Sequence, residues 1–436
     1  MMSNKGHIPY IVQMFYGVFL YEVAGLISLF FEWSNYLCML GVIITIIAYI
    51  RAPKKELPHS ANTSITLLYV VLFFMILRGS IIGNTPHLYG EGPLPKCSMY
   101  DIIRFFLVNP YSAFAVLFPL VIKVDNDPQE FKHYGRLALI ASVLSMISFW
   151  IFKDYIVSAD VYGFTDFFTS SGQISVRNLA NIVFVGLGMI LCVSWSFQYF
   201  YNNKLYWILP IVLFISFCCN VSGGGRGNSV IAFAYMFLFF LFLYQSSKTG
   251  YVSKHFIRSV FIISFIVFAA VLYYLVTNTG FLDLLMSRTF EDGDISAGFR
   301  ESTREDFVNA MIKDFNSDGY SWLIGRGVNG CFVLTGNVLR NSLEWGYMWL
   351  ILKGGVIYMV LYIYILLKAF TRGFFHSNSM LAKSLGLLCL VQVLLLIPFG
   401  LPTVSVQCLL VWHSVRLLNS EEFTELSDNE VNIMLK

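Results

Sequence analysis

Hydrophobic residues in this chain form long uninterrupted runs, and polar residues collect in the segments between them. Each run is roughly 17 to 25 residues long, and a helix of that length crosses a hydrocarbon core of about 30 Å. The alternation of apolar and polar residues that marks membrane β-strands is missing, since runs such as 238–244 are apolar on every side. The pattern therefore predicts an all-α protein that crosses a membrane several times.

The runs predict about twelve transmembrane helices. Their expected positions are roughly 9–31, 35–50, 64–83, 102–122, 136–157, 177–200, 206–222, 228–245, 257–277, 343–368, 381–397 and 402–418. No small-residue cleavage site follows the first run, so we expect it to stay as a span and not to be removed as a signal peptide. The predicted fold is a single polytopic helical bundle over residues 1–436, with one large loop at residues 278–342 between the ninth and tenth spans.

The composition supports a membrane protein and argues against a nucleic-acid-binding protein. Hydrophobic residues make up 57% of the chain and charged residues 13%, and the mean hydropathy of +0.68 lies well above that of a soluble protein. The net charge is only +3, and the tail at 421–430 is acidic. Nothing in this balance indicates a nucleic-acid partner.

The orientation follows from the lysines and arginines, because short cationic loops stay on the cytoplasmic side of a membrane. Loops at one side of the predicted spans are cationic and hold Lys5, Arg51, Lys54, Lys55, Lys123, Lys132, Arg136, Lys204, Lys248, Lys254, Arg258, Lys368, Arg372 and Lys383. The short loops at the other side are poor in cations. Both termini are then expected in the cytoplasm, and the loop at 278–342 is expected outside it.

The cysteines and histidines do not suggest a metal site. Cys97 and Cys331 fall in extracytoplasmic segments, where they either pair in an oxidising compartment or remain separate thiols. The other cysteines fall in predicted spans and act there as small hydrophobic residues. No HExxH, CxxC or other metal-ligand spacing occurs. We expect neither a metal nor a cofactor.

The large loop concentrates arginines. A helix is predicted at about 296–315, and within it Arg300 and Arg304 are four residues apart, so that both guanidinium groups lie on one face and can grip a phosphate. The alternative is a solvated helix whose arginines pair with its own acidic residues. Arg326 follows in the glycine-rich segment 325–330, whose glycines are equally explained by turn formation.

A second glycine-rich stretch, at 220–229, lies where the seventh predicted span meets the same side of the membrane. Its three successive glycines allow backbone N–H groups to surround an anion, with Arg226 at the centre. The alternative is a flexible turn with a snorkelling arginine. We favour the anion site, because loop cations are scarce on this side.

These features resemble the bacterial O-antigen ligase and Wzy-type polysaccharide polymerase superfamily. Residues 222–228 are similar to its short Ser-Arg-Gly turn, with Arg226 at the arginine position. Residues 300–328 resemble its periplasmic-loop helix and the glycine turn after it, and residues 340–344 resemble the segment that re-enters the membrane.

One position departs from the ligase pattern. Ligases of this superfamily usually carry a His-Asn-Ser type motif with an essential histidine, and this chain has Arg340-Asn341-Ser342 instead. An arginine does not act as a general base near neutral pH, because its proton does not leave. The resemblance therefore implies a polymerase, with the ligase as the alternative.

A polymerase of this superfamily is a glycosyltransferase of the bacterial inner membrane, with its active site facing the periplasm or the cell exterior. The resemblance implies transfer of a polyprenyl-diphosphate-linked oligosaccharide to another lipid-linked chain, building O-antigen or capsule, with membrane lipid and a chain-length regulator as partners. The expected catalytic residues are Arg226, Arg300, Arg304 and Glu344, and the expected substrate-binding residues are Arg177, Arg326, Arg340 and Asn341. Glu344 is either the base for the acceptor hydroxyl or an ion-pair partner of Arg340.

A membrane transporter, such as a flippase for a lipid-linked oligosaccharide, is the rival from another class. Twelve spans with both ends inside suit it, but transporters tend to place ionisable groups near the membrane midplane in two repeated halves. In this chain the cations cluster at one surface and no repeat is visible. The transferase is therefore the favoured interpretation.

Overall fold

The computed structural model describes part of the chain, and that part is mostly helical. The described residues are 8–27, 35–54, 59–81, 113–124, 303–317, 319–328, 330–334, 339–340, 343, 345–397 and 404–435, with scattered residues between 130 and 147, 236 and 244, and 253 and 273. The all-α prediction is confirmed at this level. The spans expected at 177–200 and 206–222 lie outside the described residues.

Most of the predicted spans that fall on described residues coincide with α-helices. The first three are α1 (Tyr10–Ile27), α2 (Asn35–Arg51) and α3 (His59–Ile81), and the last three are α15 (Gly346–Phe375), α16 (Met380–Leu395) and α17 (Val406–Leu418). Among the described residues, α15 alone is both long and apolar enough to cross a membrane, and the other five are shorter apolar helices. The arrangement of about twelve spans therefore stays a prediction.

The span predicted at 102–122 differs from the others in its described part. Residues Ala113–Lys123 form a 3₁₀ helix, η2, with Pro119 inside it. Proline has no backbone N–H to donate to an α-helical ladder, which favours such an irregular turn. The carbonyl of Pro119 accepts a hydrogen bond from Tyr69 Oη of α3 at 3.0 Å, so η2 is held against α3.

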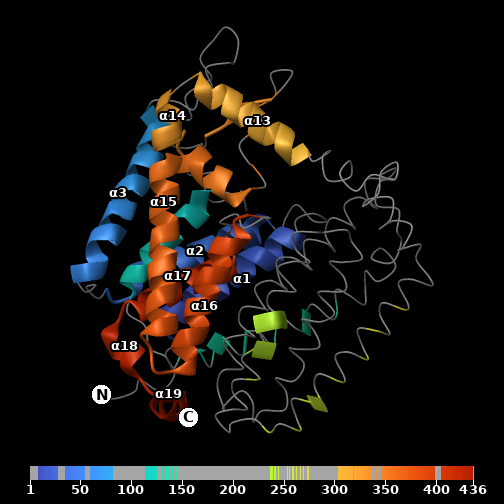
Figure 1. Cartoon of the computed structure of the whole chain (residues 1–436), viewed down its shortest axis with the longest axis vertical. Helices are drawn as coiled ribbons and strands as arrows, with labels where there is room; N and C mark the ends of the chain where they lie inside the picture. The colour runs from blue at the N-terminus through green and yellow to red at the C-terminus, as the bar shows by residue number, and fades with distance from the viewer. Residues whose placement is uncertain are drawn as a thin grey trace.

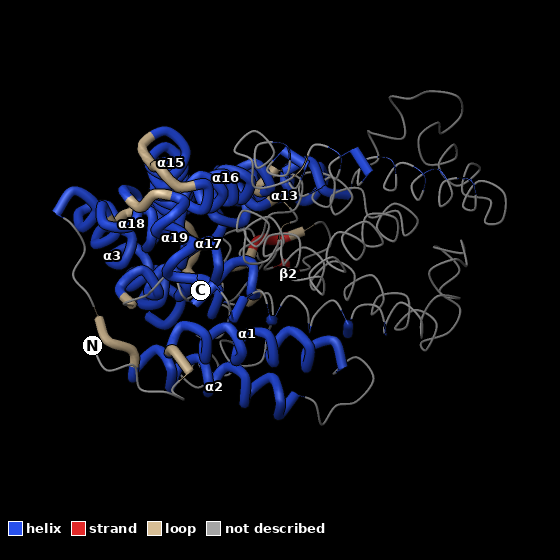
Figure 2. Tube along the Cα trace, turned by 90° about the horizontal axis from the view of Figure 1, so that it is seen from below, coloured by secondary structure: helices blue, strands red, loops and turns tan. Residues whose placement is uncertain are grey.

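Helices α1 and α2 form a closely packed antiparallel pair, and they lie side by side in Figure 2. Gly17 and Gly41 face each other, and a Cβ on Gly41 would lie 2.5 Å from the carbonyl oxygen of Gly17. Thr45 donates to the carbonyl of Gly41 at 2.8 Å, which satisfies its hydroxyl inside the interface. Small residues that let backbones approach are the usual basis of helix association in lipid.

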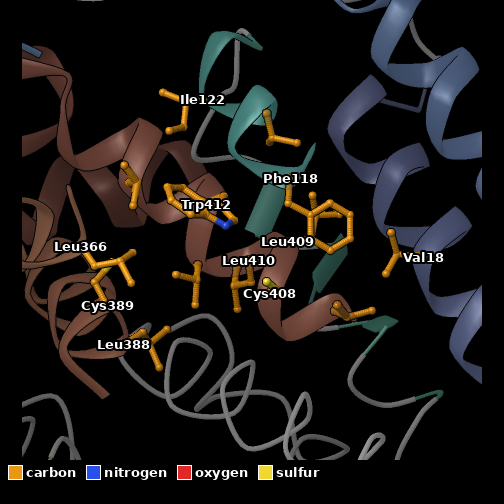
Figure 3. Packing of buried hydrophobic residues seen from close by; sticks show 14 of the residues in the cluster. Val18, Phe118, Ile122, Leu366, Leu388, Cys389, Cys408, Leu409, Leu410 and Trp412 are labelled. Carbon is orange, nitrogen blue, oxygen red and sulfur yellow. The ribbon is translucent and has the colours of Figure 1, made fainter. Parts of the chain in front are cut away.

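The main core surrounds α17, whose residues are almost all buried. Figure 3 shows side chains of α1, η2, α15 and α16 packed around α17, whose own Trp412 lies in this core. Ser405 caps this helix by accepting from the N–H of Cys408 at 3.1 Å. The buried Glu22 of α1 accepts from the N–H of Val406 at 3.2 Å, which places its carboxyl group at the N-terminal end of the helix.

The described part of the large loop forms a small layer of its own. It contains α13 (Thr303–Asn316), α14 (Gly319–Ile324), and the two short antiparallel strands β1 (Phe332–Val333) and β2 (Leu339–Arg340). The helix predicted at 296–315 matches α13 over its described length, and the residues before Thr303 lie outside the described part.

The loop layer and the C-terminal helices lie at opposite ends of the molecule. Figure 1 shows α13 and α14 at one end, and α18 (Glu421–Glu425) and α19 (Asp428–Leu435) at the other. Helices α3 and α15 extend from the loop layer toward the opposite end (Figure 1). This arrangement is the one expected if the loop and the C-terminal tail face opposite sides of a membrane.

Candidate functional site

A small apolar core attaches the loop layer to α15. It joins α13, β1 and the first turns of α15 through the buried side chains of Val308, Met311, Phe315, Phe332, Leu343, Ile351 and Leu352. The apolar residues of α13 recur three or four positions apart, so they share one helix face. The polar positions Asp306, Asn309 and Lys313 are exposed on the rest of the helix. The sequence of α13 therefore fixes which side of it meets α15.

The glycine-rich turn docks into a break in α15. Gly355 has φ 71° and ψ −175°, so the helical ladder is interrupted there. The N–H groups of Arg326 and Gly327 donate to the carbonyls of Leu352 and Lys353 at 2.8 and 2.9 Å. A Cβ on Gly325 would lie 2.5 Å from the backbone nitrogen of Gly354. Glycine is therefore required on both sides of this contact for steric reasons, beyond the turn formation that the sequence indicated.

Lys353 is a buried lysine at the same contact. Its side chain is 3% exposed, and Nζ donates to the carbonyl of Gly330 at 3.0 Å. Sequence reasoning did not select this residue. The signal was nevertheless present, because a lysine in the interior of a predicted apolar span marks a position with a specific partner.

Arg326 forms a buried ion pair with Asp314 of α13. Nη1 lies 2.6 Å from Oδ2 and Nη2 lies 3.1 Å from Oδ1, which is a two-pronged arrangement. Nε donates to Ser321 Oγ at 3.1 Å, Nη1 also donates to the carbonyl of Cys331 at 2.9 Å, and the guanidinium carbon lies 4.5 Å from the ring centre of Phe315. At 1% exposure, the predicted substrate-binding arginine contacts protein groups and not solvent.

Arg340 has the opposite environment. It lies on β2, is exposed, and its guanidinium carbon sits 4.3 Å from the centre of the Phe307 ring on α13. A guanidinium stacked on an aromatic face keeps its N–H groups directed outward in its own plane. This is an arrangement in which an arginine is held in place and still able to bind an anion.

Arg304 precedes Phe307 by three positions, about one turn, along the backbone of α13. Its side chain lies outside the described residues. The fold therefore brings two candidate arginines that are far apart in the sequence to one region of α13.

The remaining candidates lie outside the described residues. These are Arg177, Arg226, Arg300, Asn341 and Glu344. Cys97 is outside them as well, while Cys331 is buried directly before β1 in the loop layer. Within the described part of the chain, no group of three or more His, Cys, Asp or Glu residues is placed to hold a metal ion.

Comparison with known proteins adds no relative: no family model, no curated protein and no solved structure matches this chain.

Proposed function

We propose that this protein is a membrane-embedded glycosyltransferase that polymerises a polysaccharide such as O-antigen or capsule. Its substrates are polyprenyl-diphosphate-linked oligosaccharide repeat units, which it transfers onto another lipid-linked chain at the extracytoplasmic face. The proposal is supported by the apolar composition, by the arginines gathered in one polar loop, and by the resemblance of three segments to the polymerase and ligase superfamily.

The observation that carries the proposal is the exposed Arg340, whose guanidinium lies over the ring of Phe307. Phe307 follows Arg304 by about one turn along α13. Arginine binds phosphate oxygens with two parallel N–H groups, and the ring limits the orientations that the guanidinium can take. This cation is attached through β1 and α13 to the outer end of α15, the described helix that is long enough to cross a membrane. A diphosphate carried on a membrane lipid would meet it at that level.

The chemistry requires cations more than it requires a metal. The bond between the anomeric carbon and the diphosphate oxygen breaks, the acceptor hydroxyl oxygen bonds to that carbon, and the hydroxyl proton leaves. Negative charge grows on the departing diphosphate, so guanidinium groups already in place stabilise the transition state more than the ground state. We assign this role to Arg226, Arg300 and Arg304.

The other candidates take binding or proton-transfer roles in the proposal. Arg340, Arg177 and Asn341 bind the donor or acceptor phosphate, and Glu344 accepts the hydroxyl proton. Arg326 is removed from the binding set, because its four hydrogen bonds to protein groups use four of its five N–H donors.

The test is polysaccharide length in the source bacterium with the gene deleted, followed by complementation. Wild type should restore long chains, and Arg340→Ala should lower polymerisation by about tenfold or more, because a charge-assisted hydrogen bond to the bound phosphate is lost. Lys313→Ala is the matched control, because Lys313 is an exposed cation on the same loop layer. It should restore long chains fully.

The carrier-lipid intermediates separate the alternatives. Single repeat units on the normal acceptor in the deletion strain support a polymerase. Complete polymer held on its carrier lipid would instead show a ligase, and repeat units trapped on the cytoplasmic face would show a flippase. Normal polymer in the deletion strain would overturn all three.

A further inference from the structure

A buried ion pair lies directly beneath the strand that pairs with Arg340. Asp314 and Arg326 are 0% and 1% exposed, and their two short contacts measure 2.6 and 3.1 Å. A two-pronged pair of this kind fixes the relative position and the relative orientation of the two side chains. Removing either partner leaves the other charge buried and unpaired, which strongly destabilises the contact.

Each partner of the pair also holds β1, on either side of Phe332. Asp314 Oδ2 accepts from the backbone N–H of Val333 at 3.1 Å, and Arg326 Nη1 donates to the carbonyl of Cys331 at 2.9 Å. The side chain of Phe332 is fully buried in the small core beneath them. The pair and the core together therefore set where β1 lies against α13.

Strand pairing between β1 and β2 makes the position of Arg340 depend on the position of β1. In the antiparallel register, Phe332 lies opposite Arg340. The ring that Arg340 stacks on belongs to Phe307, which lies on α13 about two turns before Asp314. The contacts thus form a closed path from α13 through Asp314, β1 and β2 to Arg340, and back to α13 at Phe307.

Arg326 connects the same path to the membrane helix. Its backbone N–H donates to the carbonyl of Leu352 in α15 at 2.8 Å, next to the helix break. The residue therefore holds the hairpin with its side chain and α15 with its backbone.

We propose that Asp314 and Arg326 are positioning residues, whose ion pair holds Arg340 against Phe307 in the orientation that binds a lipid-linked diphosphate. The diphosphate part of this inference rests on the proposed function. An apolar pair of equal volume would fill the same space, but it would leave the N–H of Val333 and the carbonyl of Cys331 without these partners. The charged pair therefore secures a geometry that apolar packing alone does not specify.

The first readout is spectroscopic and does not depend on activity. A 4-fluorophenylalanine at position 307 senses the guanidinium of Arg340 above its ring, and its ¹⁹F resonance should shift in Arg340→Ala. In Asp314→Asn and Arg326→Lys the resonance should move toward that shifted position. Asp306→Asn is the matched control, because Asp306 is an exposed acid on the same helix, and it should leave the resonance unchanged.

The second readout is binding of farnesyl diphosphate to the full chain in nanodiscs, compared with farnesyl monophosphate. Asp314→Asn should raise the Kd for the diphosphate about tenfold, the loss expected for one charge-assisted hydrogen bond. The same change made in an Arg340→Ala background should have no further effect, because the pair acts through Arg340. A purely structural role would weaken binding equally in both backgrounds.

The outcomes separate the two proposals. A wild-type ¹⁹F position in Asp314→Asn would overturn the positioning role. Asp314→Glu provides a second variant if the asparagine form does not fold, since it keeps the charge and displaces the carboxylate, and an unshifted resonance there would also overturn the role. A moved resonance with unchanged diphosphate binding in Arg340→Ala would support the positioning role and contradict the proposed ligand.

Discussion

Buried ionisable side chains in this protein hold the ends of backbone segments. Glu22 accepts from the N–H of Val406 at the start of α17, and Lys353 donates to the carbonyl of Gly330. Arg326 donates to the carbonyl of Cys331 in the same way. A buried polar group is stabilised by hydrogen bonds to the nearest backbone groups, because burial without such a partner is costly. These buried side chains therefore have a structural role, because each holds a backbone segment in place, and a ligand is not needed to explain them.

Ser427 and Glu430 show the same principle at the surface and allow a prediction about pH. Glu430 Oε2 accepts from the N–H and from the hydroxyl of Ser427 at 2.8 and 2.7 Å, in a capping arrangement at the start of α19. These hydrogen bonds hold the pKa of the Glu430 carboxyl below its ordinary value. Because the pKa is lower in the folded state, the stabilisation is fully present above about pH 4.3, the ordinary glutamate value, and is lost as the pH falls through the folded pKa.

Hydrogen exchange of the α19 amides measures this effect. Exchange in wild type should become faster relative to the intrinsic rate as the pH is lowered through that range, while Glu430→Gln should show no such step. Glu425→Gln is the control, because its carboxylate accepts no hydrogen bond within the described residues, and it should retain the step. A step that persists in Glu430→Gln would show that another group is responsible.

At the scale of elements, the break in α15 and the turn that fills it form one unit. The turn supplies N–H groups to carbonyls that the helix no longer uses at Gly355, so the backbone groups on both sides are satisfied. Unsatisfied backbone groups are costly near a membrane, and irregular backbone at such places is found packed against protein. The break and the turn therefore depend on each other.

Gly355→Ala should disrupt this unit. Gly355 has φ 71°, and a Cβ there would lie 2.1 Å from the carbonyl oxygen of Leu323, so strain and overlap act together. We expect a loss of about 2–3 kcal/mol or more, seen as lower thermal stability in detergent or as less protein in the membrane. Gly325→Ala should behave alike, because it also combines a positive φ with a close approach to backbone.

Gly319→Ala is the matched control for these substitutions. A Cβ at Gly319 meets nothing within 4 Å, and alanine is the better helix former at this first position of α14. Its stability should equal or slightly exceed that of wild type. Equal stability in Gly355→Ala and Gly319→Ala would contradict the close contact between the turn and α15.

At the scale of the whole molecule, the loop layer and the C-terminal helices occupy opposite ends (Figure 1). The C-terminal end is held in place by α19, where Asp428 accepts from the N–H of Met380 at 2.7 Å. The loop end is held by the glycine-rich turn at 325–330, which packs against the break in α15. A bundle with its loop and its tail so separated suits the orientation that the positive residues predict.

Cysteine labelling tests this orientation directly. Tyr320 on α14 and Ile433 on α19 are 78% and 71% exposed, so a cysteine at either position should be accessible from its own side. A membrane-impermeant maleimide should label Tyr320→Cys in intact spheroplasts, and should label Ile433→Cys only after lysis. Wild type provides the background from the native thiols. Labelling of both variants from outside would contradict the predicted topology.

Local composition was sufficient to predict where several helices lie, but it did not predict the break within α15. An apolar run of span length favours a helix whatever its neighbours are, and the runs at 9–31, 343–368 and 402–418 correspond to α1, α15 and α17. Gly354-Gly355 was visible as a pair, yet glycine permits a break without requiring one. The break at Gly355 was decided by the turn that packs against it.

The roles of the arginines depended on contacts between distant positions. Composition indicated a polar loop rich in arginine, and spacing placed Arg304 on a helix. Arg326 and Arg340 looked equivalent in the sequence, because each is a loop arginine near glycine or asparagine. Only the tertiary structure distinguished them: Asp314 and Arg326 are paired and buried, whereas Arg340 is exposed and lies over the ring of Phe307. Burial and pairing arise from packing between segments, and one-dimensional patterns do not contain that information.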